Sequence, residues 1–570
     1  MNVSTKGKAQ HTYDAIVVGS GISGGWAAKE LAEKGLKTLV LERGRDVKHG
    51  EYPTAMMETW EFKYRNQIPP EARERQPKQS RTGYTTKEDS AHWFVDDVDN
   101  PYSEDKRFDW CRGYHVGGRS LLWGRQSYRL GDLDFEANAK DGFGVDWPVR
   151  YQEISPWYDY VEQFAGISGT NEGLAQLPDG KFLPPFALNC LETQTAARIA
   201  KAMGGRKMIA SRTANLSVPH KGRGGCQHRN RCIRGCPYGA YFSSNASTLP
   251  AAYASGNLTL RPFSIVTEVM YNADSGKASG VRITDAETNE SMEYYAKVIF
   301  LCASAIASTS ILLNSKSDRF PTGMGNDSGE LGHNLMDHHF KVGASGSYDG
   351  FHDKYYKGRR PGGVYVPRFR NLGDKATHRK DYVRGFGYQG GGSRQNWTRG
   401  VAELARFGAE LKADLVAPGE WRMGIGSWGE HLPYHDNKMI LNHDLRDKWG
   451  LPTVTFDCEF KENEREMRKD MKSSASEMLE AAGIQDIKEF DDPTSAPGLC
   501  IHEMGTARMG RDSRTSVLNG HNQVHGAPNV FVTDGACMTS SACVNPSLTY
   551  MAFTARAADF AVAELNRNNL

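Results

Sequence analysis

Three cysteines lie within eleven residues of the chain, at Cys226, Cys232 and Cys236, and a proline follows the last of them. The chain has ten cysteines in all, and no other segment carries them at this density. Thiols this close together bind a metal, pair in a disulfide or take part in redox chemistry. The role of these cysteines determines where the protein passes electrons. The motifs in the rest of the chain help to distinguish the three possibilities.

The composition excludes several classes of function. A chain of 570 residues predicts about two to four domain-sized units. Its 70 Lys and Arg nearly balance its 68 Asp and Glu, which disfavours nucleic acid as a partner. We expect no membrane span and no export signal of its own, because no apolar run reaches about 18 residues and the first residues are polar.

The N-terminal segment has the pattern of a dinucleotide-binding unit. A β-branched run over 13–18 predicts a buried strand, and the glycine-rich turn 19–24 leads into a helix over 26–34. A second strand over 37–41 ends at Glu42. The alternative, a glycine-rich turn without a ligand, is disfavoured by this order of elements.

Each glycine of the turn has a separate function in such a unit. Gly19 permits the tight turn, Gly21 lets a pyrophosphate approach the backbone, and Gly24 lets the helix pack closely on the strand. The start of the helix supplies amide hydrogens and a positive dipole to the phosphates. Glu42 would accept hydrogen bonds from the adenosine ribose.

A matching segment lies near the C-terminus. Residues 529–536 predict a strand that runs into a glycine turn, and a helix rich in alanine is expected over 551–565. The strand at 13–18 and the strand near 530 must meet in one sheet, so the substrate-handling sequence is inserted between them.

The combination of motifs resembles the glucose–methanol–choline (GMC) oxidoreductase family. The motifs are GSGISGG at the start, His115–Ser120 with Trp123-Gly124, Leu301–Ala305, Gly332–His338 and His502–Gly510. They span essentially the whole chain. The resemblance implies an α/β fold, with a doubly wound, Rossmann-like FAD-binding domain and a substrate domain on an antiparallel sheet.

It also implies a discontinuous domain organisation. The FAD domain is expected from residues 1–150, 211–340 and 500–570, and the substrate domain from 151–210 and 341–499. The cysteine segment, 224–240, belongs to the FAD domain in this division.

The resemblance assigns FAD contacts to residues in all three parts of the FAD domain. These are Gly19, Gly21, Ser23, Gly24, Glu42, Arg43, Gly117, Gly118, Ser120, Trp123, Gly124, Val266, Ala303, Asp534, Gly535, Asn545 and Pro546. Some sugar oxidases of the family attach the flavin covalently through a histidine in the loop after Gly117. Leu122 stands there in this chain, so we expect non-covalent FAD.

The matching catalytic pair is His502 and Asn545. Alcohol oxidation removes the hydroxyl proton while hydride leaves carbon, and an imidazole accepts such a proton near neutral pH. The carboxamide of Asn545 can orient the alcohol and its developing alkoxide. A His/Asn pair is more typical of the pyranose-type members of the family.

Three interpretations of the cysteines remain open from the residues alone: zinc, with His228 as a fourth ligand, a disulfide with one spare thiol, and an iron–sulfur cluster. The spacing Cys-x5-Cys-x3-Cys-Pro resembles the segment that holds a [3Fe-4S] cluster in bacterial multi-subunit FAD sugar dehydrogenases. A cluster takes one electron at a time, so it suits a cytochrome c-type acceptor. The alternative is an oxidase that uses oxygen and has structural cysteines.

Carbohydrate is the expected substrate class. Gln389, Arg394 and Asn396 could bind sugar hydroxyls while Trp397 stacks on the ring, although an ordinary glycine-rich surface loop is the alternative for this stretch. The opening sequence resembles bacterial glucoside 3-dehydrogenases, which favours oxidation at C3 of a glucoside over glucose C1 or gluconate C2.

The same relatives imply partners and a compartment. They pair with a small subunit that carries a twin-arginine signal and exports the folded catalytic subunit with it. We therefore expect a small subunit and a periplasmic location, with a cytoplasmic enzyme as the alternative.

Overall fold

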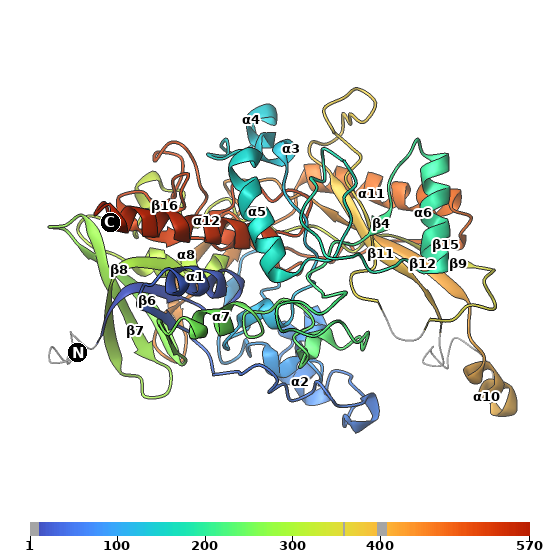
Figure 1. Cartoon of the computed structure of the whole chain (residues 1–570), viewed down its shortest axis with the longest axis horizontal. Helices are drawn as coiled ribbons and strands as arrows, with labels where there is room; N and C mark the ends of the chain where they lie inside the picture. The colour runs from blue at the N-terminus through green and yellow to red at the C-terminus, as the bar shows by residue number, and fades with distance from the viewer. Residues whose placement is uncertain (1–10, 357–359, 396–406) are drawn as a thin grey trace.

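The computed structural model describes residues 11–356, 360–395 and 407–570, and it contains three sheets (Figure 1). The largest has eight strands and carries the glycine-rich turn. Its strands are β1 (Thr12–Val18), β2 (Thr38–Leu41), β5 (Leu258–Arg261), β6 (Ser264–Asn272), β7 (Lys277–Asp285), β8 (Ser291–Leu301), β16 (Gln523–Val524) and β17 (Ala527–Val532).

The centre of this sheet is parallel, in the order β17-β8-β1-β2-β5. Leu301 at the end of β8 pairs with Val18 of β1 on one side and with Val532 of β17 on the other. The prediction that the first strand and the strand near 530 share a sheet is therefore confirmed, with β8 between them. Because their carboxyl ends are level, the loops that follow these strands meet at one edge.

Five helices lie around the large sheet: α1 (Ile22–Glu33), α5 (Tyr151–Ala165), α7 (Thr248–Ala254), α8 (Ala305–Asn314) and α12 (Ser547–Asn566). α1 packs against α7 and α12, and α12 also packs against α5. Small apolar residues of α1 and α12, such as Ala28 and Ala558, join Val17 of β1 in one buried cluster. The helices consequently approach the strands closely and hold the start of α1 at the sheet edge.

A second, six-stranded sheet lies beside the first in Figure 1, and its hydrogen-bonded neighbours are antiparallel. Its order is β15 (Gln485–Asp491), β9 (Val342–Tyr348), β12 (Trp421–Gly429), β11 (Phe386–Arg394), β10 (Val364–Val366) and β4 (Ile209–Ala210). α11 (Glu462–Ala481) and α6 (Cys190–Ala202) pack on it and enclose a separate apolar core. The predicted α/β class with an antiparallel second sheet is confirmed, whereas the division into two domains stays a prediction.

The remaining elements are short. The third sheet contains β13 (Lys438–Arg446), β14 (Pro452–Asp457) and β3 (Ser103–Glu104). The other α-helices are α2 (Pro70–Arg75), α3 (Asp132–Phe135), α4 (Ala137–Asp141) and α10 (Gly408–Val416). The 3-10 helices are η2 (Thr59–Glu61), η3 (Gln79–Thr82), η4 (Tyr84–Thr86), η5 (Ala91–Trp93), η6 (Gly118–Leu121), η7 (Cys232–Arg234), η8 (Asn326–Ser328) and η9 (Gly535–Cys537).

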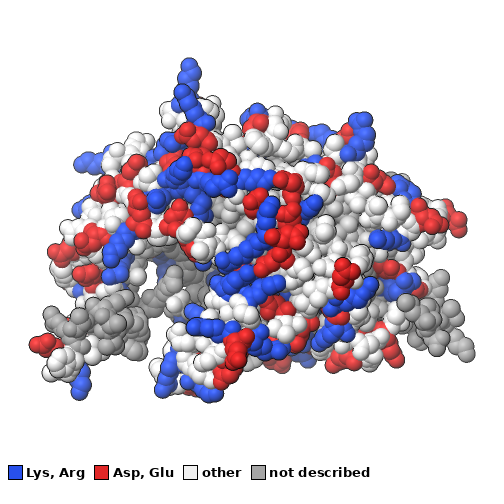
Figure 2. Space-filling view, turned by 180° about the vertical axis from the view of Figure 1, so that it is seen from behind, with Lys and Arg blue, Asp and Glu red and all other residues white. Residues whose placement is uncertain are grey.

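The surface carries charges of both signs. On the face shown in Figure 2, lysine and arginine alternate with aspartate and glutamate, in keeping with a formal net charge of +2. Over the described ranges, no helix combines the length and the apolar character needed to cross a bilayer.

Two helices begin earlier than the sequence pattern predicts. α1 starts at Ile22 rather than at residue 26, and α12 starts at Ser547 rather than at residue 551. In α1 the first turn contains Gly24, and a Cβ atom built there would lie 1.9 Å from the carbonyl oxygen of Gly19. The glycine therefore lets the helix begin directly on the turn, which apolar periodicity does not reveal.

We predict that Gly24→Ala lowers the melting temperature by about 5 °C or more, because the added methyl group forces α1 away from the turn. Differential scanning calorimetry of the FAD-loaded protein measures the effect. Gly426→Ala is the control, since Gly426 lies in β12 away from the cavity and a Cβ atom there comes no closer than 3.8 Å to another residue. A Gly24→Ala protein as stable as the Gly426→Ala protein would contradict the packing account.

Candidate active site

One cavity at the carboxyl edge of the large sheet collects most of the predicted cofactor residues. Those that line it are Gly19, Gly21, Ser23, Glu42, Arg43, Gly118, Ser120, Trp123, Gly124, Val266, Ala303, Asp534, Gly535 and Asn545. Of the other predicted FAD contacts, Gly24 lies in the first turn of α1, Gly117 precedes η6, and Pro546 precedes α12. Segments far apart in sequence thus form one site.

The glycine turn leaves room for a phosphate group. Gly19 has a φ of +92°, which favours glycine, and a Cβ atom there would meet the carbonyl oxygen of Cys302 at 2.6 Å. Gly21 is open on its Cβ side and lines the cavity directly before α1. The amides at the start of α1 therefore suit a pyrophosphate, and the donor set fits FAD.

Glu42 is buried and holds the adjoining loops in place. Its carboxylate accepts hydrogen bonds from the Ser20 amide (3.1 Å), the Ser20 hydroxyl (2.5 Å) and the Gly44 amide (3.0 Å). Burial raises the pKa of Glu42 despite these bonds. Ser20 Oγ also accepts the Gly117 amide at 2.9 Å, so the carboxylate expected at the ribose also connects the turn to the loop before η6.

Several predicted FAD contacts make fixed hydrogen bonds at the walls. Trp123 Nε1 donates to the Phe242 carbonyl at 2.9 Å, and Ser120 Oγ donates to the Gly117 carbonyl at 2.5 Å. Asp534 accepts from Ser308 Oγ at 2.5 Å, and burial raises its pKa to about 6. These bonds fix the cavity walls before any ligand binds.

His502 and Asn545 face each other in this cavity. Asn545 Nδ2 lies 3.4 Å from His502 Nε2, and Gln389 Nε2 donates to Asn545 Oδ1 at 2.6 Å. With its oxygen occupied by Gln389, the Asn545 amide presents its NH2 group to the histidine and to the cavity. An alcohol oxygen placed between the two residues could accept from Asn545 and donate to His502 Nε2.

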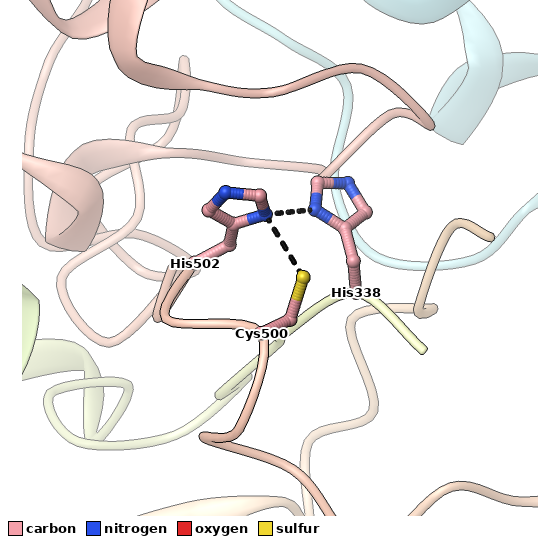
Figure 3. Close-up of side chains that lie close together, drawn as sticks. All are labelled: His338, Cys500 and His502. Carbon is pink, nitrogen blue, oxygen red and sulfur yellow. Dashed lines mark hydrogen bonds between the residues drawn. The ribbon is translucent and has the colours of Figure 1, made fainter. Parts of the chain in front are cut away.

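The opposite edge of His502 contacts two more side chains (Figure 3). His502 Nδ1 lies 2.8 Å from His338 Nδ1 and 3.4 Å from Cys500 Sγ. Burial lowers the pKa of His502 well below its ordinary value, and His338 and Arg119 lower it further. His502 is therefore a neutral imidazole near pH 7, the form that accepts a proton.

Two buried carboxyl groups hold the His502 segment. Asp337 Oδ1 accepts the amides of His338 (2.9 Å) and His502 (3.0 Å), and Oδ2 accepts those of Gly498 (2.8 Å) and Cys500 (3.1 Å). Next to His502, the Glu503 carboxylate forms two hydrogen bonds with Arg119 of η6 at 3.2 and 2.9 Å. The His502 segment is consequently tied both to the residues after Met336 and to the loop expected to wrap the flavin.

The three cysteines lie together beside this cavity. All ten cysteines fall within the described ranges and are free, so the disulfide interpretation has no support in the structure. Burial raises the pKa of Cys226 and Cys236, and the neighbouring thiols raise it further. Among described residues, the one group with ligand atoms spaced for a single ion is His338, Cys500 and His502, and the three cysteines are not such a group.

The predicted sugar-binding residues separate into three cases. Gln389 of β11 contacts Asn545 at the cavity. Arg394, five residues further along β11, donates to the main-chain carbonyls of Gly419, His352 and Lys354. Asn396 and Trp397 lie outside the described residues. Gln389 is therefore the member of this set whose contacts connect it to the catalytic pair.

Sequence models of the GMC oxidoreductase family match residues 13–340 and 433–554. This chain belongs to the GMC oxidoreductases.

Several named proteins align with nearly the whole chain. It is 28% identical to 2-methyl-1,2-propanediol dehydrogenase of Mycolicibacterium austroafricanum, over 96% of this chain and 94% of the relative. It is 26% identical to the fructose dehydrogenase large subunit of Gluconobacter japonicus, over 97% and 98%. Among solved structures, formate oxidase of Aspergillus oryzae shares the fold, with a TM-score of 0.62, 14% identity and coverage of 98% and 99%. The chain is accordingly an FAD-dependent oxidoreductase that acts on CH–OH groups.

Within this GMC site, the sequence pattern leaves the functions of His338, Asp337 and Glu503 unassigned. Asp337 and His338 stand in a quoted family motif, yet their contacts with His502 depend on a crossing of segments more than 160 residues apart. One signal in the sequence could have found Asp337 and His338: they directly follow the apolar pair Leu335-Met336. The structure shows that both polar side chains are buried there, which is unusual unless they have partners.

We predict that His502→Ala lowers the rate of flavin reduction by substrate about 10²–10⁴-fold, the range of general base catalysis. Anaerobic stopped-flow absorbance measures this half-reaction, and the flavin-to-protein ratio shows whether FAD stays bound. An unchanged single-turnover rate would refute the role of His502. Retained FAD is expected, since the glycine turn and Glu42, which are predicted to hold the pyrophosphate and the ribose, are unchanged in this variant.

The lowered pKa of His502 also sets the pH dependence of this half-reaction. The base must be neutral to accept the proton, and a pKa well below 6.5 keeps it neutral until the solution is more acidic than that. We therefore expect protonation of His502 to slow flavin reduction only below pH 6.5, whereas a fall near pH 7 would belong to Asp337, whose pKa burial raises to about 7. NMR titration of ¹⁵N-histidine-labelled protein separates the two groups, and a His502 ring that titrates at or above pH 6.5 would contradict the buried, neutral histidine.

Proposed function

We propose that this protein is an FAD-dependent dehydrogenase that oxidises a sugar hydroxyl to a ketone, at C3 of a glucoside or of glucose. In this proposal electrons leave the flavin through a [3Fe-4S] cluster held by Cys226, Cys232 and Cys236, toward a cytochrome-type acceptor. The observation that carries the proposal is the single cavity that joins the predicted FAD contacts with His502 and Asn545.

The two catalytic side chains divide the work on the substrate. His502 Nε2 accepts the hydroxyl proton, and Asn545 Nδ2 donates a hydrogen bond to the oxygen as negative charge develops on it. Bound FAD supplies the acceptor for the hydride that leaves the carbon. Loss of one proton and one hydride converts CH–OH to C=O, so the step balances without a further reactant.

The named relatives support a polyol or sugar as the substrate. Fructose dehydrogenase and 2-methyl-1,2-propanediol dehydrogenase are both named for hydroxyl compounds, and both align with nearly all of this chain. The choice of C3 rests on the likeness of the opening sequence to glucoside 3-dehydrogenases. The words "large subunit" in the name of the Gluconobacter relative support an assembly with further subunits.

The donor set at the cysteines suits a multi-iron cluster better than a single zinc ion. Two thiolates on one tetrahedral zinc ion lie about 3.8 Å apart, given Zn–S bonds of about 2.3 Å. The three cysteines are not among the described groups whose ligand atoms converge on a single ion, whereas a cluster spreads its ligands over separate iron atoms. Main-chain amides also hydrogen-bond the sulfurs of Cys226 and Cys236, as expected for thiolate ligands.

The cysteine segment adjoins the flavin loop directly. The Tyr241 hydroxyl lies 2.6 Å from the carbonyl oxygen of Leu121 in η6 and 3.2 Å from that of Cys232 in η7. Ile233, the neighbour of Cys232, lines the same cavity as the predicted FAD residues. This placement supports electron transfer from a flavin in the cavity to the three cysteines next to it.

The outer side of the cysteine segment supports an external acceptor. Arg229 donates to the Met56 sulfur at 3.3 Å and lies over the ring of Tyr238 at 5.6 Å. Met56 and Tyr238 are 64% and 43% exposed, so apolar side chains are exposed beside Arg229 of this segment. We propose that the acceptor docks here, and that a small subunit carries the protein to the periplasm.

The substrate is tested by anaerobic incubation with methyl glucoside, glucose and gluconate, with identification of the product by NMR. A 3-keto product and rapid reduction of an artificial dye are expected. In a parallel incubation in air, peroxide formation as fast as dye reduction would establish an oxidase instead, and absence of any sugar product would refute the substrate class.

We predict that Cys232→Ser leaves flavin reduction by the sugar within about twofold but lowers reduction of cytochrome c at least about tenfold, because the exit for single electrons is lost. Cys190→Ser is the matched control, since Cys190 is also half-buried but begins α6 on the second sheet. Equal cytochrome c reduction by both variants would contradict the proposed route.

A further inference from the structure

We infer that His338 is a positioning residue that keeps a proton on Nδ1 of His502, so that Nε2 is unprotonated and can accept the proton of the substrate. This inference rests on the proposed function, because it takes His502 as the base. It adds a residue to which the sequence pattern assigns no function, and it explains how one of two imidazole tautomers is selected.

The carbonyl group of Ala542 determines the tautomer of His338. His338 Nε2 lies 2.8 Å from the carbonyl oxygen of Ala542, which can only accept, so Nε2 of His338 carries the proton. Burial lowers the pKa of His338 to about 4, and the ring is neutral near pH 7. A neutral imidazole has one N–H, so His338 Nδ1 is an acceptor.

The tautomer of His338 in turn determines the tautomer of His502, through the contact between their Nδ1 atoms. With His338 Nδ1 as the acceptor, the 2.8 Å contact between the two Nδ1 atoms requires that His502 Nδ1 carries the proton (Figure 3). His502 Nε2 is then unprotonated and points to Asn545. The hydrogen bonds run in one direction from Gln389 to Ala542, which strengthens each of them.

A metal ion between these side chains is disfavoured by their spacing. His338, Cys500 and His502 are a donor set with converging atoms. Two imidazole nitrogens on one tetrahedral zinc ion lie about 3.3 Å apart, given Zn–N bonds of about 2.0–2.1 Å. The 2.8 Å separation is instead that of a direct hydrogen bond.

Two residues next to the histidine pair have an unfavourable backbone conformation. Ile501, directly before His502, has a φ of +66°, and Ala542, which supplies the accepting carbonyl, has a φ of +54°. A β-branched residue in this region is a genuine outlier, and such strain persists where the surroundings enforce it. The four amide hydrogen bonds to Asp337 supply that enforcement.

Other titratable groups face the pair from neighbouring elements. They are Asp337, His339, Cys500, His431, Glu503 and Arg119. Burial raises the pKa of Cys500 well above its usual range, so it stays a neutral thiol beside His502 Nδ1. Arg119 is neutralised by Glu503 through two hydrogen bonds. His338 is thus the neighbour that offers a strong acceptor to His502 Nδ1.

Two substitutions separate positioning from simple packing. His338→Asn keeps an acceptor oxygen near the place of Nδ1, whereas His338→Gln keeps a group near the place of Nε2 and removes that acceptor. In FAD-loaded protein, we expect His338→Gln to lower the rate of flavin reduction about 10²-fold with little change in KM, and His338→Asn to restore it to within about tenfold of the wild type. His333→Asn, on a ring that stacks on His435, is the matched control.

The tautomer itself is read without substrate from long-range proton–nitrogen NMR of protein with ¹⁵N-labelled histidine. The His502 signals are assigned by their loss in His502→Ala. A protonated Nδ1 and an unprotonated Nε2 are expected in the wild type and in His338→Asn, and a mixture of tautomers in His338→Gln.

Three results would overturn the inference: a protonated Nε2 in the wild type, equal rates in His338→Gln and the wild type, or equal losses in the Asn and Gln variants together with loss of FAD. Failure of the proposed function looks different, because wild-type flavin would then not be reduced by any sugar while the tautomer signals stayed as expected.

Discussion

The buried carboxyl group of Asp337 accepts four main-chain amides, and the geometry of the site depends on these bonds. They join residues 337–338, which precede the second sheet, to the loop 498–502, which returns toward the first. Burial raises the pKa of this group to about 7, while the amide bonds oppose the rise. One side chain therefore fixes the distance between His338 and His502.

The large sheet imposes the second constraint. The carboxyl ends of β1, β8 and β17 are level, so the glycine turn, the loop before α8 and the Asp534 segment meet at one edge. The glycine turn places the start of α1 at the cavity. The antiparallel sheet contributes Gln389 from β11, which orients Asn545. The residues of the candidate active site thus come from both sheets.

Much of this arrangement could be predicted from the sequence, because it depends on local rules. Gly19, Gly21 and Gly24 between a strand and a helix indicate the nucleotide turn, and the strand near 530 has to share its sheet. Relations across the fold are not local. The contact of His338 with His502, the pairing of Arg119 with Glu503 and the positive φ of Ile501 arise only after distant segments pack. The contact of Gln389 with Asn545 also depends on distant segments, and its contact with a sugar hydroxyl stays a prediction.

The proposed electron exit completes the account: the cysteine segment packs against η6, and we propose that it takes electrons there from the reduced flavin. The most direct measurement is iron quantitation with electron paramagnetic resonance on anaerobically purified, FAD-loaded protein. The account predicts about three iron atoms per flavin and the signal of an oxidised three-iron cluster. Protein with full flavin and dehydrogenase activity but no iron would contradict it.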